Sequence, residues 1–531
     1  MPQRSYSPTA AVILSLIPGL GHVYVRRPAR GLIVAIPWIA VISAAFLVVV
    51  FDRHALLSAA TGSTALLTSL TLILIILLVC HALVVVDAFR LAGGTLRGIT
   101  KLSGGARLAG PVMVAVLLAT TVFYGRAASL TYDGAQALSN IFGVAPVFIS
   151  DNGTPPPNYS PPDDNAIDTP PPAASDSATP STSATPFPTH APVVYQLGDL
   201  PSFTGSATNW AADGQLNVLL IGIDAGAGGG RYYGLRPDSM ILLQVDIATG
   251  RAAMYGIPRN LTNVPLPPES ALHYACHCYG PGPGQNASNF LIDYLWQEAA
   301  QTHPAWYSQY GTGSSTTAQF LRGLGALEGA VSELAGLQVD GAVVINLPGF
   351  VQLIDALAPD GLNINVPYEV KQIRGMAYSL SDGRRVFNID IKAGQQVMNG
   401  EVALEYARLR HVIGYDSDYY RMKRQQLVLR AVRDQINPCG LLPQLPSILN
   451  ALGGSVWTDL PQSDTPTFAA LAAKVGSTNT ADYSLDPATT GAQYDLLDQT
   501  SLNKIHDIVA HGLDSVPAGI SGGSGGGGLS C

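Results

Sequence analysis

The runs NVLLIGI (217–223), SMILLQVDI (239–247) and AAMYGI (252–257) decide the fold, because each is an apolar run of strand length. Apolar side chains at most positions are typical of strands that are buried on both faces. Thr249 and Gly250 separate the second run from the third, and this turn predicts an antiparallel hairpin. The three runs therefore predict the centre of a sheet.

Helices and further strands follow these runs in alternation. Asn399 directly precedes GEVALEYA (400–407), and asparagine is a preferred residue at a helix N-cap. Alternating elements with one hairpin predict an α/β fold in which helices cover a mixed sheet. We assign this domain to residues 203–515, which are enough to bury a core. The other expected elements are helices at 316–336, 348–357 and 420–436 and strands at 341–347 and 361–367.

The N-terminal part of the chain predicts a membrane domain. The 531 residues have a mean hydropathy of +0.24 and 12% charged side chains, about half the share of a soluble domain. Three stretches come close to the ~20 apolar residues that cross a bilayer, so we expect residues 1–125 to be all-α with about three transmembrane helices. The run 11–25 is shorter and broken by Pro18, and we expect it to lie at the interface or to re-enter. The three stretches are 31–51, 64–89 and 108–124.

Basic residues indicate how these stretches are oriented. They precede the first stretch and separate the second from the third, whereas the loop between the first two carries only Arg53 and His54 beside Asp52. Since basic loops stay in the cytoplasm, the N-terminus is expected inside and everything after about residue 125 outside. We therefore expect a multi-pass protein of the cell membrane with an extracytoplasmic C-terminal domain. The flanking basic residues are Arg4, Arg26, Arg27, Arg30, Arg90, Arg97, Lys101 and Arg107.

Two segments have the composition of linkers. Residues 126–202 contain NGTPPPNYSPPDD and further Pro, Ser and Thr, which predicts an extended, solvated stalk outside the membrane. Residues 516–531 form a glycine-rich tail. The net charge of −8 argues against nucleic acid as a partner, since phosphate neutralisation needs a basic surface.

The glycine run GIDAGAGGGR (222–231) resembles a nucleotide-binding loop only in composition. No helix pattern follows it, no acid stands at the usual distance on a second strand, and no GK[ST] is present. We therefore interpret it as a flexible lid or a surface loop.

Acids and arginines collect at the predicted ends of these strands. Asp224 follows the first run and Asp238 precedes the second, and such carboxylates suit Mg²⁺, with Mn²⁺ as an alternative. Guanidinium groups match phosphate oxygens in pairs, so the arginines predict an anion site. The alternative is ordinary salt bridges, with Arg408 and Arg410 paired to Glu405 or Asp416. The candidate anion-binding residues are Arg236, Arg259, Arg408, Arg410, Arg421, Arg424 and Gln425.

The exported domain resembles the LytR–CpsA–Psr family of membrane-anchored bacterial phosphotransferases. The resemblance rests on motifs that occur in order over most of residues 215–475. It implies an α-β-α sandwich with a long apolar cavity for a lipid. It also implies transfer of a glycopolymer from a polyprenyl-pyrophosphate carrier to a peptidoglycan hydroxyl, which forms a phosphodiester. The motifs are NVLLIGID, LRPDSMILLQVD, AMYGIPRN, VVINLPGFVQLIDALAPDGLNINVP, NGEVALEYARLRHVIGYDSDYYRMKRQQLVLRAV and the weaker VWTDLP.

By this resemblance, Asp224 and Asp238 correspond to metal-binding acids, and Arg236, Arg259, Arg408, Arg410, Arg421 and Gln425 to pyrophosphate-binding residues. Two departures stand out. The family usually has Asp after the arginine of IPR, where this chain has Asn260. The usual Lys-Ile-Asn element is replaced by HYACHCYGPGPGQNASNF (273–290) and an insertion to about residue 315, which is expected to border the acceptor side.

The expected reaction is an in-line attack of a sugar hydroxyl on the lipid-linked phosphate. Asp224, Asp238 and Arg259 are the expected catalytic residues, with the two acids as metal ligands and, as a less favoured alternative, as general base. Two other functions remain open: a non-catalytic regulator that binds polyprenyl phosphate or wall polymer, and a polyprenyl-pyrophosphate pyrophosphatase.

The cysteines allow two interpretations. His273, Cys276, His277 and Cys278 form an HxxCHC cluster that could bind a metal. Outside the cell a disulfide is favoured, either within this loop or to Cys439. Because a Cys-x-Cys bridge is strained, we expect Cys276 or Cys278 to pair with Cys439.

Overall fold

The computed structural model describes most of the chain, in two compact units. Asp224, Cys439, most of the predicted stalk and the C-terminal tail lie outside the described residues. The described residues are 6–51, 63–94, 108–143, 211–223, 236–372, 377–379, 385–387, 389–410, 412–415, 417–435, 455–475, 479–492 and 495–516.

The first unit consists chiefly of Met1–Ser139 and is helical. The predicted break within 11–25 is present, because two short helices flank a turn in which Gly19 has the left-handed φ of 93°. A Cβ at Gly21 would lie 2.0 Å from Ser15 Oγ, so this turn packs tightly. The helices are α1 (Pro8–Leu14), α2 (Leu20–Tyr24), α3 (Pro28–Phe51), α5 (Thr64–Leu91) and α6 (Ala109–Ile141).

Two of the three predicted spans coincide with helices that are long and apolar enough to cross a membrane, namely α5 and α6. The predicted span 31–51 falls on α3, whose apolar part within the described residues, Pro28–Ser43, is shorter. The number of three spans is therefore not confirmed. Helix α6 also continues to Ile141, beyond the predicted end of the membrane part at residue 125.

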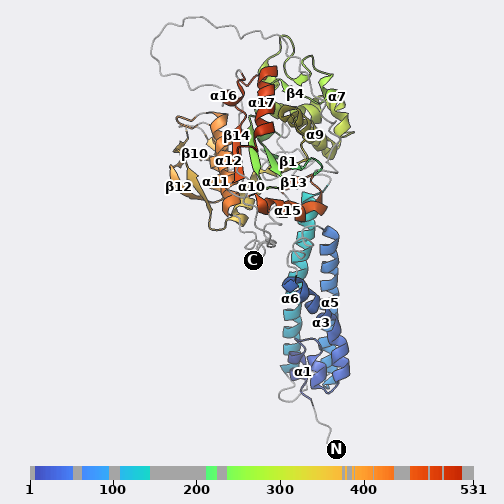
Figure 1. Ribbon diagram of the computed structural model, residues 1–531. Helices are drawn as coiled ribbons and strands as arrows, with labels where there is room; N and C mark the ends of the chain where they lie inside the picture. Colours follow the sequence, from blue (N-terminus) through green and yellow to red (C-terminus); the bar gives the residue numbers. More distant parts are fainter. Residues whose placement is uncertain are drawn as a thin grey trace, which may run out of the picture. The chain divides into compact units, whose positions relative to one another are not determined.

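The second unit is built around a six-stranded mixed sheet with the order β13-β6-β1-β2-β3-β14 (Figure 1). The central strands β1, β2 and β3 pair antiparallel, as the sequence predicts. Strand β6 lies parallel to β1, and β14 lies parallel to β3. The strands are β1 (Gln215–Ile223), β2 (Pro237–Asp246), β3 (Ala252–Ile257), β6 (Gly341–Asn346), β13 (Val456–Thr458) and β14 (Thr480–Ser484).

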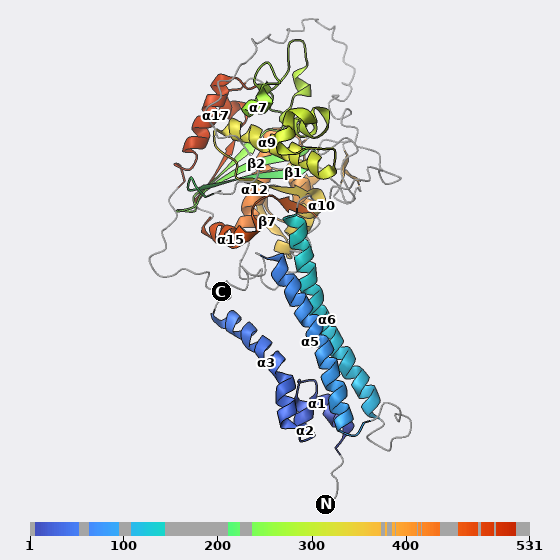
Figure 2. The same cartoon turned by 90° about the vertical axis from the view of Figure 1, so that its right-hand side faces the viewer.

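Helices cover both faces of this sheet (Figure 2). Helices α9 (Thr316–Ala335) and α17 (Gln499–His511) lie on one face and share a core with β1, β2 and β3. Helices α10 (Leu347–Leu357), α11 (Gly400–Arg408) and α12 (Asp418–Gln435) lie on the other. The expected N-cap is present, since the Asn399 side chain accepts from the Val402 amide. The mixed sheet between two helical layers is thus confirmed.

One predicted strand lies outside the main sheet. Strand β7 (Leu362–Val366) pairs with β12 (Gly394–Met398), and together with α10, α11 and α12 they form a second core cluster. The remaining elements are β4 (Val264–Pro265), α7 (Pro268–Ala271), β5 (Cys278–Tyr279), η2 (Ala287–Asn289), α8 (Ile292–Gln297), η3 (Glu298–Thr302), η4 (Pro304–Tyr310), β8 (Val370–Lys371), β9 (Ala377–Ser379), β10 (Arg385–Phe387), β11 (Asp390–Ile391), η6 (Gln462–Asp464), α15 (Thr465–Lys474) and α16 (Pro487–Thr490).

Candidate functional site

Strand pairing brings the predicted acids and arginines to one edge of the sheet. In the antiparallel register the last residue of β1, Ile223, is opposite Pro237, and Met240 is opposite Ile257. Asp238 therefore opens β2 beside the end of β1, and Arg259 follows the end of β3 at the same edge. The first β-strands alone thus place an acid and an arginine side by side.

The Asp238 carboxylate is shared by two guanidinium groups. Oδ1 accepts from Arg259 Nη1 at 3.0 Å and from Arg410 Nη2 at 3.2 Å. Arg421 Nη2 donates to the main-chain oxygen of Asp238 at 3.1 Å. Three of the predicted anion-binding arginines therefore meet at the start of strand β2.

Asp418, at the start of α12, is a second acid of this group. It lies 3.2 Å from Arg259 Nε and 3.4 Å from Arg421 Nη2, with Arg410 Nε at 3.8 Å. Burial opposes its charge, but Arg421, Arg259 and Arg410 together hold the pKa of Asp418 below its usual value. The N-terminus of α12 also favours a negative charge at this place.

Asp293, from α8, is the third acid and the most deeply buried. Its side chain is 1% exposed, and Oδ2 accepts from Arg259 Nη1 at 3.5 Å. The other oxygen, Oδ1, is buried without a hydrogen-bond partner among the described residues. Burial raises the pKa of Asp293 to about 6 despite the attraction of Arg259.

Arg259 and Arg421 remain cationic at neutral pH. Burial works against the charge of Arg259, but Asp238, Asp418 and Asp293 outweigh burial and raise its pKa above the ordinary value. Burial lowers the pKa of Arg421 to about 10, which still leaves it protonated. Buried guanidinium groups held in fixed positions can bind the oxygens of a polyanion in pairs.

Arg236 is held beside this group by an aromatic ring. Its guanidinium carbon lies 4.1 Å from the centre of the Tyr294 ring, which is a cation–π contact. Tyr294 is the residue after Asp293, so two neighbouring residues of α8 contact Arg236 and Arg259.

Arg424 and Gln425, two other predicted residues, contact main-chain oxygens in and directly after α11. The Arg424 side chain is fully buried and donates to the main-chain oxygens of Tyr406 (2.9 Å) and Leu409, so it joins α12 to the end of α11. Gln425 Nε2 donates to the Ala407 oxygen at 3.3 Å. Arg408 ends α11, and Asp224 lies outside the described residues.

Sequence reasoning missed Asp293 and Asp418. Asp418 stood within the quoted motif DSDYYRMKR at the start of a predicted helix, where an acid is favoured. Asp293 lies in the apolar run LIDYLW of the insertion, and nothing in that run distinguishes a site residue from a surface acid.

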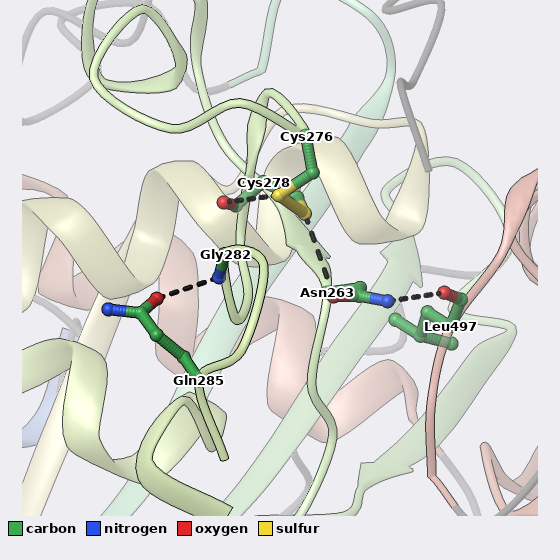
Figure 3. The surroundings of a disulfide bond; sticks show 6 residues. All are labelled: Asn263, Cys276, Cys278, Gly282, Gln285 and Leu497. Atoms are coloured by element: carbon green, nitrogen blue, oxygen red, sulfur yellow. Dashed lines mark hydrogen bonds between the residues drawn. A yellow bond between two sulfur atoms is a disulfide. The ribbon is translucent and has the colours of Figure 1, made fainter. Parts of the chain in front are cut away.

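The favoured disulfide is confirmed, but its predicted partner was wrong, because Cys276 and Cys278 bond to each other rather than to Cys439 (Figure 3). The intervening His277 has a left-handed φ of 54°, and this turn brings the two Cα atoms to 5.0 Å. Beside the bridge, the Asn263 amide donates to the Leu497 oxygen at 3.2 Å (Figure 3). With both sulfurs in a disulfide, the thiolate metal site is excluded. In the part of the chain that the structure describes, no three His, Cys, Asp or Glu side chains are placed to hold a metal ion.

Comparisons with known proteins identify a family and several similar proteins. Residues 195–510 match the LytR_cpsA_psr family. The chain is similar to regulatory protein MsrR of Staphylococcus aureus (strain COL), with 24% identity over 261 residues that make up 49% of this chain and 60% of MsrR. It is also similar to biofilm regulatory protein A of Streptococcus mutans serotype c, with 28% identity over 130 residues, or 24% of this chain and 30% of that protein. The chain thus spans less than two thirds of these relatives.

Among solved structures, TagV of B. subtilis shows 19% identity and a TM-score of 0.37, covering 57% of this chain and 98% of TagV. TagT bound to LI-WTA shows 20% identity and a TM-score of 0.33, covering 56% of this chain and 91% of TagT. The family match contains the main sheet and every residue of the arginine–aspartate group, and it extends over more than half of the 531 residues. The chain belongs to the LytR_cpsA_psr family.

Proposed function

We propose that this protein transfers a glycopolymer from a polyprenyl-pyrophosphate carrier to a peptidoglycan hydroxyl and so forms a phosphodiester link. The observation that carries the proposal is the Asp238 carboxylate held between Arg259 and Arg410, with Arg421 on its main-chain oxygen. A group of mostly buried guanidiniums at one sheet edge is costly unless it serves an anion. Pyrophosphate presents the oxygens that such forks recognise.

The charge balance of the group supports a requirement for a cation. Among the described residues of the group, four guanidiniums and three carboxylates leave an excess of one positive charge, which is less than a pyrophosphate diester needs. Asp238 fits as a metal ligand, because it is a partly exposed carboxylate at a strand end and hard oxygen donors suit Mg²⁺. Asp224 would be the second ligand. Bound Mg²⁺ would supply further charge neutralisation at the phosphates.

The proposed reaction exchanges a phosphoanhydride bond for a phosphate ester bond and needs no ATP. The acceptor oxygen forms a bond to the sugar-linked phosphorus, and the bond from that phosphorus to the bridging oxygen of the polyprenyl phosphate breaks. The leaving polyprenyl phosphate takes the negative charge, which Arg259, Arg410 and Arg421 are placed to stabilise. The hydroxyl proton passes to a carboxylate of the site or to water.

The two apolar helices support a location in the membrane. Helices α5 and α6 are long and apolar enough to span a bilayer. With the basic loops facing the cytoplasm, the family domain would be extracytoplasmic, where lipid carrier and peptidoglycan meet.

The test uses the full chain in detergent with Mg²⁺, a polyprenyl-pyrophosphate-linked disaccharide, and peptidoglycan present or omitted. We expect a disaccharide–peptidoglycan product with the wild type and about a hundredfold less with Arg259→Ala, since a fork that contacts the developing charge is lost. Arg251→Ala is the matched control, because the Arg251 guanidinium lies 3.3 Å from the carboxylate of Asp246, at the other end of β2.

Each product identifies one function. Transfer that is lost in Arg259→Ala and kept in Arg251→Ala supports the proposal. Release of disaccharide phosphate and polyprenyl phosphate without transfer would instead identify a pyrophosphatase, and retention of intact lipid without turnover would identify a binding regulator.

A further inference from the structure

We propose that the 273–315 insertion is part of the anion site, with Asp293 and Tyr294 as positioning residues for Arg259 and Arg236. This inference rests on the proposed function, and it assigns a role to the segment where the Lys-Ile-Asn element of the family is not recognisable. Asp293 would take the place of the charged partner that Asn260 does not supply beside Arg259.

The start of α8 is attached to the segment that carries Arg259. The Ile292 amide donates to the Leu261 oxygen at 2.8 Å, and the Asp293 amide donates to the Arg259 oxygen at 3.4 Å. Asp293 therefore contacts Arg259 through both its main chain and its carboxylate, which lies 3.5 Å from Nη1. The next residue places its ring 4.1 Å from the Arg236 guanidinium. Two adjacent side chains of the insertion thus fix two arginines.

The insertion is held firmly enough to position them. Arg322 of α9 is 2% exposed and donates to the oxygens of Ala299 (3.1 Å) and Ala300 (2.9 Å), directly after α8. Its Nη1 donates to the oxygens of Gly311 (3.1 Å) and Gly313 (2.8 Å). One buried guanidinium therefore joins η3 and the segment that follows η4 to helix α9.

Asp293 is not explained by stability. A buried carboxylate with one oxygen left without a partner costs free energy, and an apolar or amide side chain would avoid that cost. Retention of such a group beside an arginine of the site is expected where orientation matters more than stability.

The test measures kcat and the donor KM of the full chain in detergent, with a polyprenyl-pyrophosphate-linked disaccharide, peptidoglycan fragments and Mg²⁺. For Asp293→Asn we expect kcat to fall about tenfold, because a charge-assisted contact to Arg259 is weakened. The donor KM is not expected to rise, since removal of a negative charge does not weaken anion binding. Asp340→Asn is the matched control. Asp340 is a buried aspartate whose carboxylate accepts from the main-chain amide of Asn217, at the opposite end of β1.

Binding of inorganic pyrophosphate, measured by calorimetry in the same detergent, does not depend on turnover. Tyr294→Leu should weaken this binding about fivefold through loss of the cation–π contact, whereas Tyr294→Phe keeps the ring and should bind as the wild type does. The calorimetry therefore tests the inference even where the wild type transfers nothing and the proposed function fails.

A wild-type kcat in Asp293→Asn would overturn the inference. So would a fall in kcat that is accompanied by a higher donor KM and a lower melting temperature, since that pattern indicates a folding defect. Equal binding by Tyr294→Phe and Tyr294→Leu would remove the role of the ring. A selective fall in kcat together with weaker binding only in Tyr294→Leu would support it.

Discussion

Asp293→Asn should make the protein more stable at neutral pH while lowering its activity. The pKa of Asp293 rises from 3.8 to about 6 on folding, chiefly through burial. The folded state therefore holds the proton more tightly than the unfolded chain does. Since the folded pKa is the higher one, this contribution to stability is present below pH ~4 and is lost as the pH rises through about 6.

The magnitude follows from the shift. Each pKa unit corresponds to 1.36 kcal/mol, so the free energy of unfolding is ~3 kcal/mol lower at pH 7.5, where Asp293 is ionised, than at low pH, where it is protonated. Asparagine does not titrate and resembles the protonated acid. The variant should thus gain up to ~3 kcal/mol in the free energy of unfolding at pH 7.5 and little at pH 4.

Urea unfolding followed by tryptophan fluorescence at pH 4, 6 and 7.5 measures this difference, and Trp296, buried in α8, reports on the neighbourhood of Asp293. Asp340→Asn serves as the control, because burial also raises the pKa of Asp340, to about 7, away from the site. It should show a similar pH effect with wild-type activity. A stability difference that is absent, or that does not change with pH, would refute the reasoning.

Three further perturbations have defined outcomes. Adding Asn260→Asp to Asp293→Asn should restore about a third or more of the lost transfer rate, because one charge-assisted contact to Arg259 is recovered. No recovery would show that the two positions do not act on the same guanidinium. Arg424→Met should lower the free energy of unfolding by about 2–6 kcal/mol, because two buried carbonyl groups each lose their donor, and an unchanged urea midpoint would contradict this. Gly21→Val should lower the melting temperature of the full chain in detergent, because a Cβ there would lie 2.0 Å from Ser15 Oγ, whereas Gly125→Val, with no atom within 4 Å, should lower it much less; equal shifts would be evidence against tight packing at Gly21.

The sequence predicts the centre of the fold better than its edges. The β2–β3 hairpin and the Asn399 cap were predictable, because a local turn and a local hydrogen bond specify them. Strand β14 was not, since TADYS has no apolar run and every one of its residues is only partly buried. Its pairing with β3 joins segments far apart in sequence.

The site shows the same division. Asp238 and Arg259 could be placed together because strand register fixes them, whereas Asp293 reaches Arg259 only through the packing of the insertion. Arg424 follows Arg421 by three residues on the same helix, and only their partners in the folded chain differ. Arg424 donates to the main-chain oxygens of Tyr406 and Leu409, whereas Arg421 contacts Asp238 and Asp418. The Cys276–Cys278 bridge depends on a left-handed residue that no composition rule assigns to His277.

Arg259 takes its carboxylate partners from three separate segments, with Asp238 on β2, Asp293 on α8 and Asp418 on α12. With several partners, the loss of one carboxylate by substitution leaves Arg259 with others. The residue next to the arginine can change from Asp to Asn if an acid in another segment, such as Asp293, pairs with the same guanidinium. A family member that lacks the usual Asp after this arginine can therefore still have a carboxylate partner for it. The diverged loops are where that substitute acid should be sought.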